Sequence, residues 1–236
     1  MTRKVRRFSV WILAAIFMLN VFLASLTNVP THPTESDDVV FRTVLHLPKL
    51  QRSLTYEQEL QLIRSVQDLV LKEAPGQTPI PEYQDREPAD LFRTKSGLCY
   101  DRSRTLDKLL NWYGFRTRHV YILYAVHPAT GERLPFWRAF FTKGTDSHAV
   151  TEVKTSLGWL VVDSNSLWIS VAANGDPVGA DHIHAQADRF ASMPEYWNRP
   201  FWAIRGLYSR RGQFYRPYIT FPELNWPDFL MWIVAE

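Results

Sequence analysis

Apolar positions recur at helical spacing in two parts of the chain. The first run follows Thr55 and Gln58, which have the spacing of an N-terminal capping box, and it ends at Pro75. Its apolar positions are Leu60, Ile63, Val66, Leu69 and Val70. The second run covers residues 98–113 and ends before Gly114, a residue typical of the end of a helix. The pattern therefore predicts two amphipathic helices.

Short runs rich in β-branched and aromatic residues follow the second helix. Turn-forming residues bound each run, which is typical of strands joined by tight turns. The predicted strands are residues 119–126, 135–141, 148–153 and 159–163. A helix followed by an antiparallel meander belongs to the α+β fold class.

The N-terminal segment has a different pattern. Arg3, Lys4, Arg6 and Arg7 precede residues 8–26, which are almost all apolar. As a helix these 19 residues cover about 28 Å, close to the bilayer's hydrocarbon thickness of about 30 Å. We predict an N-terminal membrane helix acting as a signal anchor, with a cleaved signal peptide as the alternative. The basic flank places everything after residue 27 on the extracytoplasmic (periplasmic or extracellular) side, membrane-anchored or, after cleavage, secreted.

Composition and charge narrow the remaining possibilities. A length of 236 residues with 46% apolar and 22% charged residues fits one globular domain. Residues 8–236 carry 23 Lys and Arg against 24 Asp and Glu, which excludes the basic surface typical of nucleic-acid binding. We divide the chain into a signal anchor or signal peptide at 1–27, a tether at 28–52 and a folded domain at 53–236.

Cys99 is the only cysteine, so no internal disulfide can form. It falls in the first turn of the helix predicted at 98–113, where the helix dipole favours a thiolate. A nucleophilic thiol needs a histidine base that a third group orients. His148 begins one predicted strand and Asp163 ends the next, so antiparallel pairing places them side by side. Each residue alone is more often structural, but their joint occurrence in this order favours a catalytic Cys99, His148 and Asp163.

These residues and their neighbours resemble the transglutaminase-like cysteine enzymes, bacterial type, a branch of the papain-like fold. The resemblance lies in Ser96-Gly97-Leu98-Cys99, in residues 109–118, in residues 147–153 and in residues 158–164, and it covers the core motif at 95–165. It implies a nucleophile helix packed on an antiparallel sheet. It also implies Cys99 as nucleophile, His148 as general base and then acid, and Asp163 as the residue that orients the imidazole. Two departures from the family pattern, Val150 and Tyr100-Asp101-Arg102, concern substrate choice.

The resemblance implies acyl transfer on amide bonds through a thioester, with no cofactor. Hydrolysis and transfer to an amine share the first half-reaction, so both remain open. The expected location makes peptide or protein amides, including cell-wall peptides, the substrate class, with the membrane as partner of the N-terminal helix and no nucleic acid. The alternative is a non-catalytic envelope protein that keeps the fold as a binding module or scaffold.

Other residues carry weaker hypotheses. The backbone N–H of Cys99 is one expected oxyanion donor, and Gln84 in the proline-rich loop at 74–95 is a candidate for a second. A metal hypothesis rests on Asp181, His182, His184 and Asp188, although solvated loop histidines are favoured. The aromatic C-terminal segment after Met193 is expected to pack on the core, with sugar stacking or membrane contact as alternatives.

Overall fold

A computed structural model describes residues 11–19, 21–22, 28–46, 54–81, 86–208 and 223–235. Its named elements are α2 (Glu35–Val39), η1 (Val40–Val44), α3 (Tyr56–Glu73), α4 (Pro88–Thr94), α5 (Cys99–Trp112), β1 (Arg116–Tyr124), α6 (Phe136–Phe141), β2 (Ser147–Lys154), β3 (Trp159–Val162), η2 (Ala180–His182), η3 (His184–Arg189), η4 (Glu195–Asn198), β4 (Phe201–Arg205), β5 (Leu207–Tyr208), β6 (Glu223–Leu224) and α7 (Trp226–Ala235). This mixture of helices with an antiparallel sheet agrees with the predicted α+β class.

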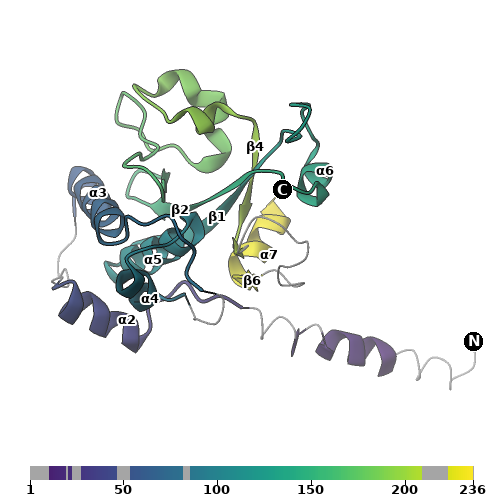
Figure 1. Cartoon of the computed structure of the whole chain (residues 1–236), viewed down its shortest axis with the longest axis horizontal. Coiled ribbons are helices and arrows are strands. Elements are labelled where there is room, and N and C mark those ends of the chain that lie inside the picture. Colours follow the sequence, from purple (N-terminus) through teal and green to yellow (C-terminus); the bar gives the residue numbers. More distant parts are fainter. Residues whose placement is uncertain are drawn as a thin grey trace, which may run out of the picture.

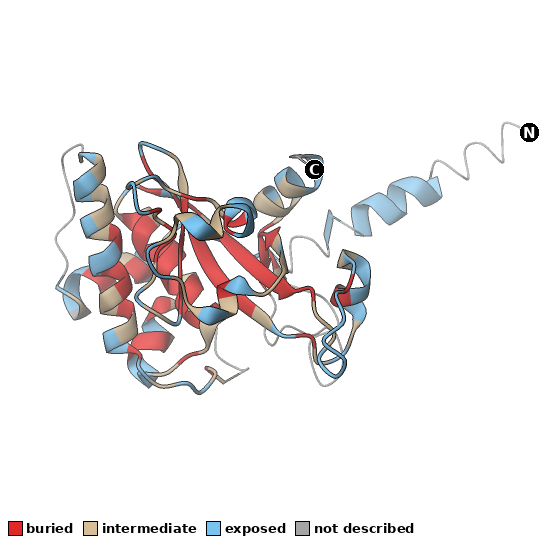
Figure 2. Ribbon diagram, turned by 90° about the horizontal axis from the view of Figure 1, so that it is seen from above, coloured by how far each residue is buried: buried red, intermediate tan, exposed pale blue. Residues whose placement is uncertain are grey.

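The main sheet has the strand order β3-β2-β1-β4, with every neighbouring pair antiparallel (Figure 1). Alternate side chains of each strand point to opposite faces. One face packs against α3 and α5 at one end and against α6 and α7 at the other. The opposite face is covered by the segment 168–201, which includes η2, η3 and η4. The sheet is therefore buried on both faces, as Figure 2 shows.

Both predicted helices form, and for the predicted reasons. The capping box at the start of α3 is present: the Gln58 amide N–H donates to Thr55 Oγ1 at 3.4 Å, and the Thr55 N–H donates to Gln58 Oε1 at 3.1 Å. Helix α5 ends before Gly114, whose φ of +93° is a conformation that glycine adopts without strain. These ends fix where the helices lie along the chain.

The strand predicted at 135–141 is wrong, because this segment forms helix α6. A short apolar run fits a buried helix turn as well as a strand. As a helix, the run brings Phe136 and Phe140 onto one side, with ring centroids 5.8 Å apart, and Phe136 reaches Trp232 of α7 at 6.1 Å. The fourth strand of the sheet is β4 instead, which pairs with β1 and was not predicted.

The segment at 28–52, predicted as an irregular tether, is folded wherever it is described. Residues 34–44 form α2 and η1 with a capping box at Thr34. Val29 is 4% exposed and Phe41 is fully buried in the core beside α3 and α5. Residues 28–46 therefore pack on the domain.

The predicted anchor at 8–26 is described only in part. Residues 11–19 and 21–22 are helical, and their large apolar side chains are exposed. Residues 8–10, 20 and 23–27 lie outside the described residues. Within the described part of the chain, no helix combines the length and the apolar character that crossing a membrane requires. The anchor stays a prediction.

Replacing Asp37 with alanine should destabilise the domain. Asp37 Oδ2 lies 2.8 Å from Nζ of Lys108, and both side chains are buried. The substitution leaves a buried ammonium with one carboxylate partner fewer, at a cost of about 2 to 4 kcal/mol in the free energy of unfolding. Urea denaturation measures the change. Asp68→Ala is the matched control, because its exposed pair with Lys72 contributes about 0.5 kcal/mol or less. An equal loss in the two variants would contradict the prediction.

Candidate active site

Cys99 is the first residue of α5, as the sequence predicts. The preceding residue Leu98 is the N-cap, and its N–H donates to Oδ2 of Asp101 at 3.0 Å. Gly97 is fixed by packing: a Cβ at this position would lie 2.4 Å from Leu91 Cδ1 and 2.9 Å from Asp101 Cβ. The tight turn before Cys99 therefore depends on the absence of a side chain at residue 97.

His148 and Asp163 meet on one face of the sheet. The register of β2 and β3 pairs Thr151 with Val162, so Asp163 continues opposite Val150, two residues from His148. Residues related in this way share a face. Nε2 of His148 lies 3.3 Å from both carboxylate oxygens of Asp163. The other ring nitrogen, Nδ1, is left for the thiol of Cys99, whose pKa His148 lowers.

Asp163 is held by four further donors. Its Oδ2 accepts the hydroxyl of Tyr196 at 2.6 Å and the indole N–H of Trp197 at 2.9 Å. Its Oδ1 accepts the backbone N–H groups of Asn165 at 2.7 Å and Ser166 at 3.0 Å. A carboxylate that is buried and accepts this many hydrogen bonds is held in one orientation and in its ionised form.

The surroundings favour charge separation between the thiol and the imidazole. Burial alone raises the pKa of Cys99, but the hydrogen bond and positive charge of His148 outweigh it and lower the pKa below its usual value. Burial alone lowers the pKa of His148, yet the charge and hydrogen bond of Asp163, together with the thiolate, raise it to about 10. The pKa of Asp163 is lowered, because His148 and the hydrogen-bond donors outweigh its burial. The site thus favours a thiolate beside an imidazolium.

Arg102 joins helix α5 to the loop after Asp163. It is 1% exposed, and its Nη1 donates to Oδ1 of Asn165 at 2.9 Å. Its Nε and Nη2 donate to the carbonyl oxygen of Ala74, and Nη2 also donates to that of Gly76 at 2.7 Å. Because the N–H of Asn165 donates to Asp163, Arg102 connects helix α5 to the residue beside this carboxylate.

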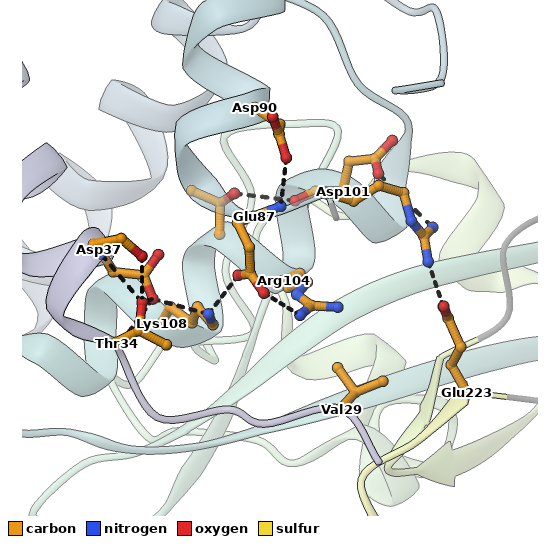
Figure 3. A network of polar contacts seen from close by, with 12 residues as sticks. Val29, Thr34, Asp37, Glu87, Asp90, Asp101, Arg104, Lys108 and Glu223 are labelled. Carbon is orange, nitrogen blue, oxygen red and sulfur yellow. Dashed lines mark hydrogen bonds and ion pairs between the residues drawn. The ribbon is translucent and has the colours of Figure 1, made fainter. Parts of the chain in front are cut away.

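A series of ion pairs connects α5 to neighbouring segments (Figure 3). Asp101, which accepts the N–H of Leu98, has its Oδ1 3.9 Å from Nη1 of Arg86. Arg86 in turn binds Glu223 of β6. Further along the helix, both Arg104 and Lys108 bind Glu87, and Lys108 also binds Asp37. These pairs join α5 to the segment before α4, to α2 and to β6.

A second histidine near α5 has a structural role. Nδ1 of His119 lies 2.9 Å from Oγ of Ser103 and 3.7 Å from Oδ2 of Asp107. All three residues are fully buried, so a substrate cannot reach them. Burial, assisted by nearby Arg104, lowers the pKa of His119 to about 3, and the imidazole is neutral at physiological pH.

The weaker hypotheses have separate outcomes. Gln84 lies outside the described residues. Asp181 pairs with Arg205, and Nε2 of His184 lies 2.6 Å from the carbonyl oxygen of Arg199. Over the ranges that the structure describes, no group of three His, Cys, Asp or Glu side chains could hold a metal ion.

Sequence reasoning missed Tyr196, Trp197, Asp101 and Arg102 as residues that support the site. Tyr196 and Trp197 lie in η4, more than 30 positions beyond Asp163. Their only sequence signal is the excess of aromatic residues after Met193, which we expected to pack on the core. Trp197 does so and is fully buried, but its indole N–H also binds the carboxylate.

Tyr196→Phe should slow the reaction of Cys99 with a thiol reagent at acidic pH. The hydroxyl of Tyr196 stabilises the ionised Asp163, so its removal raises the pKa of that carboxyl. Protonation of Asp163 then removes support for the imidazolium at a higher pH than in the parent. We expect the acid limb of the labelling profile to move up by about one pH unit, the equivalent of one charge-assisted hydrogen bond. An unchanged limb would assign Tyr196 a packing role only, and Tyr56→Phe is the matched control, because its hydroxyl binds Gly175.

A thiol at a helix N-terminus, coupled to a histidine and a carboxylate on an antiparallel sheet, defines a cysteine-dependent acyl-transfer or hydrolase site. The chain carries a domain of the transglutaminase-like superfamily, because residues 48–164 match that family's model. This finding confirms the resemblance. The superfamily in general comprises cysteine proteases and transglutaminases. A comparison with the curated proteins gives no match.

Proposed function

We propose that the domain transfers acyl groups from amide bonds through a thioester on Cys99, with His148 as base and acid and Asp163 as the orienting group. The observation that supports this proposal best is the position of His148, whose Nε2 lies 3.3 Å from both carboxylate oxygens of Asp163 and whose charge lowers the pKa of the Cys99 thiol. In this role the three residues form a catalytic triad.

In the first half-reaction the thiolate attacks the amide carbonyl carbon. The negative charge moves to the carbonyl oxygen, and the backbone N–H of Cys99 is a suitable donor to it, because the first N–H groups of a helix have no intrahelical acceptor. The proton on Nδ1 of His148 passes to the leaving nitrogen. The C–N bond then breaks, which gives a thioester and a free amine.

In the second half-reaction His148 takes a proton from water or from an amine, and the resulting nucleophile attacks the thioester. The C–S bond breaks and the thiolate returns with the imidazolium. Water gives a carboxylic acid, and an amine gives a new amide. Both outcomes use the same residues, so access of water to the thioester determines whether the protein is a hydrolase or a transferase.

The proposal includes a place of action. The four basic residues before the apolar segment at 8–26 favour a membrane-anchored domain on the extracytoplasmic side, or a secreted domain after cleavage. Peptide or protein amides, including cell-wall peptides, are then the accessible substrates. A reporter that is active only outside the cytoplasm, fused after residue 236, should be active. Activity of a cytoplasm-only reporter at that position would refute the location.

The reaction is tested by trapping the acyl-enzyme. The protein is incubated with glutamine-containing peptides and cell-wall stem peptides, quenched in acid and analysed by intact mass. A mass increase of one acyl group on Cys99 supports the proposal, and hydroxylamine should remove it. Cys99→Ala is the control and should show no adduct. An adduct located elsewhere, or no adduct from any peptide together with no activation of the thiol, would favour the non-catalytic scaffold.

A further inference from the structure

The outer face of helix α7 consists of apolar side chains. Leu230, Met231, Ile233 and Val234 are 53%, 50%, 52% and 85% exposed. The opposite side of the same helix packs Phe229 and Trp232 against the sheet. A ten-residue helix that is apolar on both sides is typical of one that is covered on both sides. The outer face of α7 therefore suits an apolar environment better than water.

Helix α6 extends this apolar surface. Phe136 of α6 contacts Trp232 of α7, and Figure 1 shows the two helices at the same end of the sheet. Trp137 and Phe141 of α6 are each 63% exposed, and the exposed Arg138 lies between them in the sequence. Exposed tryptophan beside basic side chains is typical of the headgroup region of a bilayer.

The start of α7 is bound to the chain directly after the apolar segment at 8–26. Asn28 forms a parallel bridge with Leu224, and the Val29 N–H donates to the Leu224 carbonyl oxygen at 2.8 Å. The N–H of Trp226, the first residue of α7, lies 3.3 Å from Oδ1 of Asn28. Two residues span at most about 7 Å. If the apolar segment enters a membrane, α7 must begin close to its surface.

Arginine and aspartate side chains line a pocket beside the apolar face. A pocket of about 320 Å³ is lined by Arg116, Arg118, Asp181, Arg205, Asp228, Met231 and Trp232. Arg118 and Arg205 are paired with the buried Glu152. Among the described residues Arg116 has no ion pair, and its guanidinium lies 5.7 Å from the ring centre of Trp159. An exposed arginine next to an apolar helix suits the phosphate of an anionic lipid headgroup.

We propose that α6 and α7 lie in the headgroup region of a phospholipid bilayer, with the exposed side chains of residues 137, 141, 230, 231, 233 and 234 inserted. This inference rests on the proposed membrane anchoring of the N-terminal segment. The bilayer is preferred over a second copy of the chain, because Asn28 binds the start of α7 and lies two residues after the apolar segment at 8–26. Helix α7 therefore begins close to any membrane that this segment enters. Residues 28–46, which follow the apolar segment, are folded against the domain. The domain is therefore held in one orientation on the membrane.

The test is the depth of a nitroxide spin label on the full chain in vesicles of phosphatidylethanolamine and phosphatidylglycerol. Single cysteines are introduced in the Cys99→Ala background as Leu230→Cys and Val234→Cys. The matched control is Leu157→Cys, which replaces an apolar residue that is 63% exposed in the turn between β2 and β3. Thermal unfolding checks that each variant is folded. Collision rates with oxygen and with a water-soluble nickel complex are measured at each position.

We expect the ratio of oxygen to nickel collision rates at residues 230 and 234 to be several-fold higher than at residue 157. Equal ratios would overturn the inference. Low rates with both reagents, together with spin–spin broadening, would also overturn it, since that result indicates burial against a second copy. Phe17→Cys separates this outcome from failure of the anchor: a lipid-exposed residue 17 with water-exposed residues 230 and 234 refutes the inference and keeps the anchor. A water-exposed residue 17 refutes the anchor itself.

Discussion

Asp163→Asn should lower turnover by about 10³- to 10⁴-fold, because the substitution removes the carboxylate that sets the tautomer of a catalytic histidine. In the parent, Nε2 of His148 donates to Asp163, so Nδ1 faces Cys99. An asparagine amide can instead donate to Nε2. The ring proton then moves to Nδ1 of the neutral imidazole, which can no longer take a proton from the thiol or from the second nucleophile.

The hydrogen bonds around Asp163 make this effect larger. The hydroxyl of Tyr196 and the indole of Trp197 both donate to its Oδ2. An asparagine that keeps its carbonyl oxygen toward these donors must turn its amino group toward His148. The substitution preserves size while reversing the polarity at the imidazole.

Turnover is measured on the peptide that forms the acyl-enzyme, with the rates of thioester formation and breakdown determined separately. Asp176→Asn is the matched control, because Asp176 is an exposed aspartate paired with Arg189. It should retain the parent rate. A folded Asp163→Asn variant with a rate within a few-fold of the parent would show that this carboxylate does not orient a catalytic base.

The three central residues could be predicted because their placement depends on local structure. Cys99 follows a tight turn at the start of one helix, and that helix has clear apolar periodicity. His148 and Asp163 are 15 positions apart on two strands joined by a short turn, so antiparallel pairing fixes their proximity. Local patterns of this kind are strong in a single sequence.

The residues that support Cys99, His148 and Asp163 could not be predicted in this way. Tyr196 and Trp197 reach Asp163 from a segment with short helical turns and little periodicity. Asp101 and Arg102 are charged residues, which sequence reasoning places on the surface, yet both are 1% exposed. Their burial is stable only because partners from distant segments satisfy their charges, and one sequence gives no signal for such pairs.

Segments with weak local preference account for the errors in the fold. The run at 135–141 is too short for its apolar pattern to distinguish a helix from a strand, and packing against Trp232 decides the outcome. Residues 28–46 contain two prolines and scattered charges, which suggested a tether. Their fold depends on contacts between Phe41 and the core and between Asp37 and Lys108, both of which are long-range.

His148→Ala should remove the high reactivity of Cys99 toward iodoacetamide near neutral pH. The imidazolium, whose pKa is raised to about 10, stays protonated across neutral pH and lowers the pKa of the thiol. In the variant only burial and the helix N-terminus act on the thiol, and burial raises its pKa. An unperturbed thiol with a pKa of about 8.5 is only about 1% thiolate at about pH 6.5.

The expected loss in labelling rate at about pH 6.5 is roughly 10- to 30-fold, since a thiolate of lower pKa is also a weaker nucleophile and part of the gain from ionisation is cancelled. The rate of the parent should stay nearly constant as the pH falls from about 8 to about 6 and should then decrease as the thiolate is protonated, whereas the variant should need alkaline pH. Labelling of the unfolded proteins, which must be equal, excludes a difference in the thiol itself. His182→Ala replaces an exposed histidine and should behave as the parent. If His148→Ala labels as fast as the parent at neutral pH, the thiol is not coupled to this imidazole, and the proposed acyl transfer loses its base.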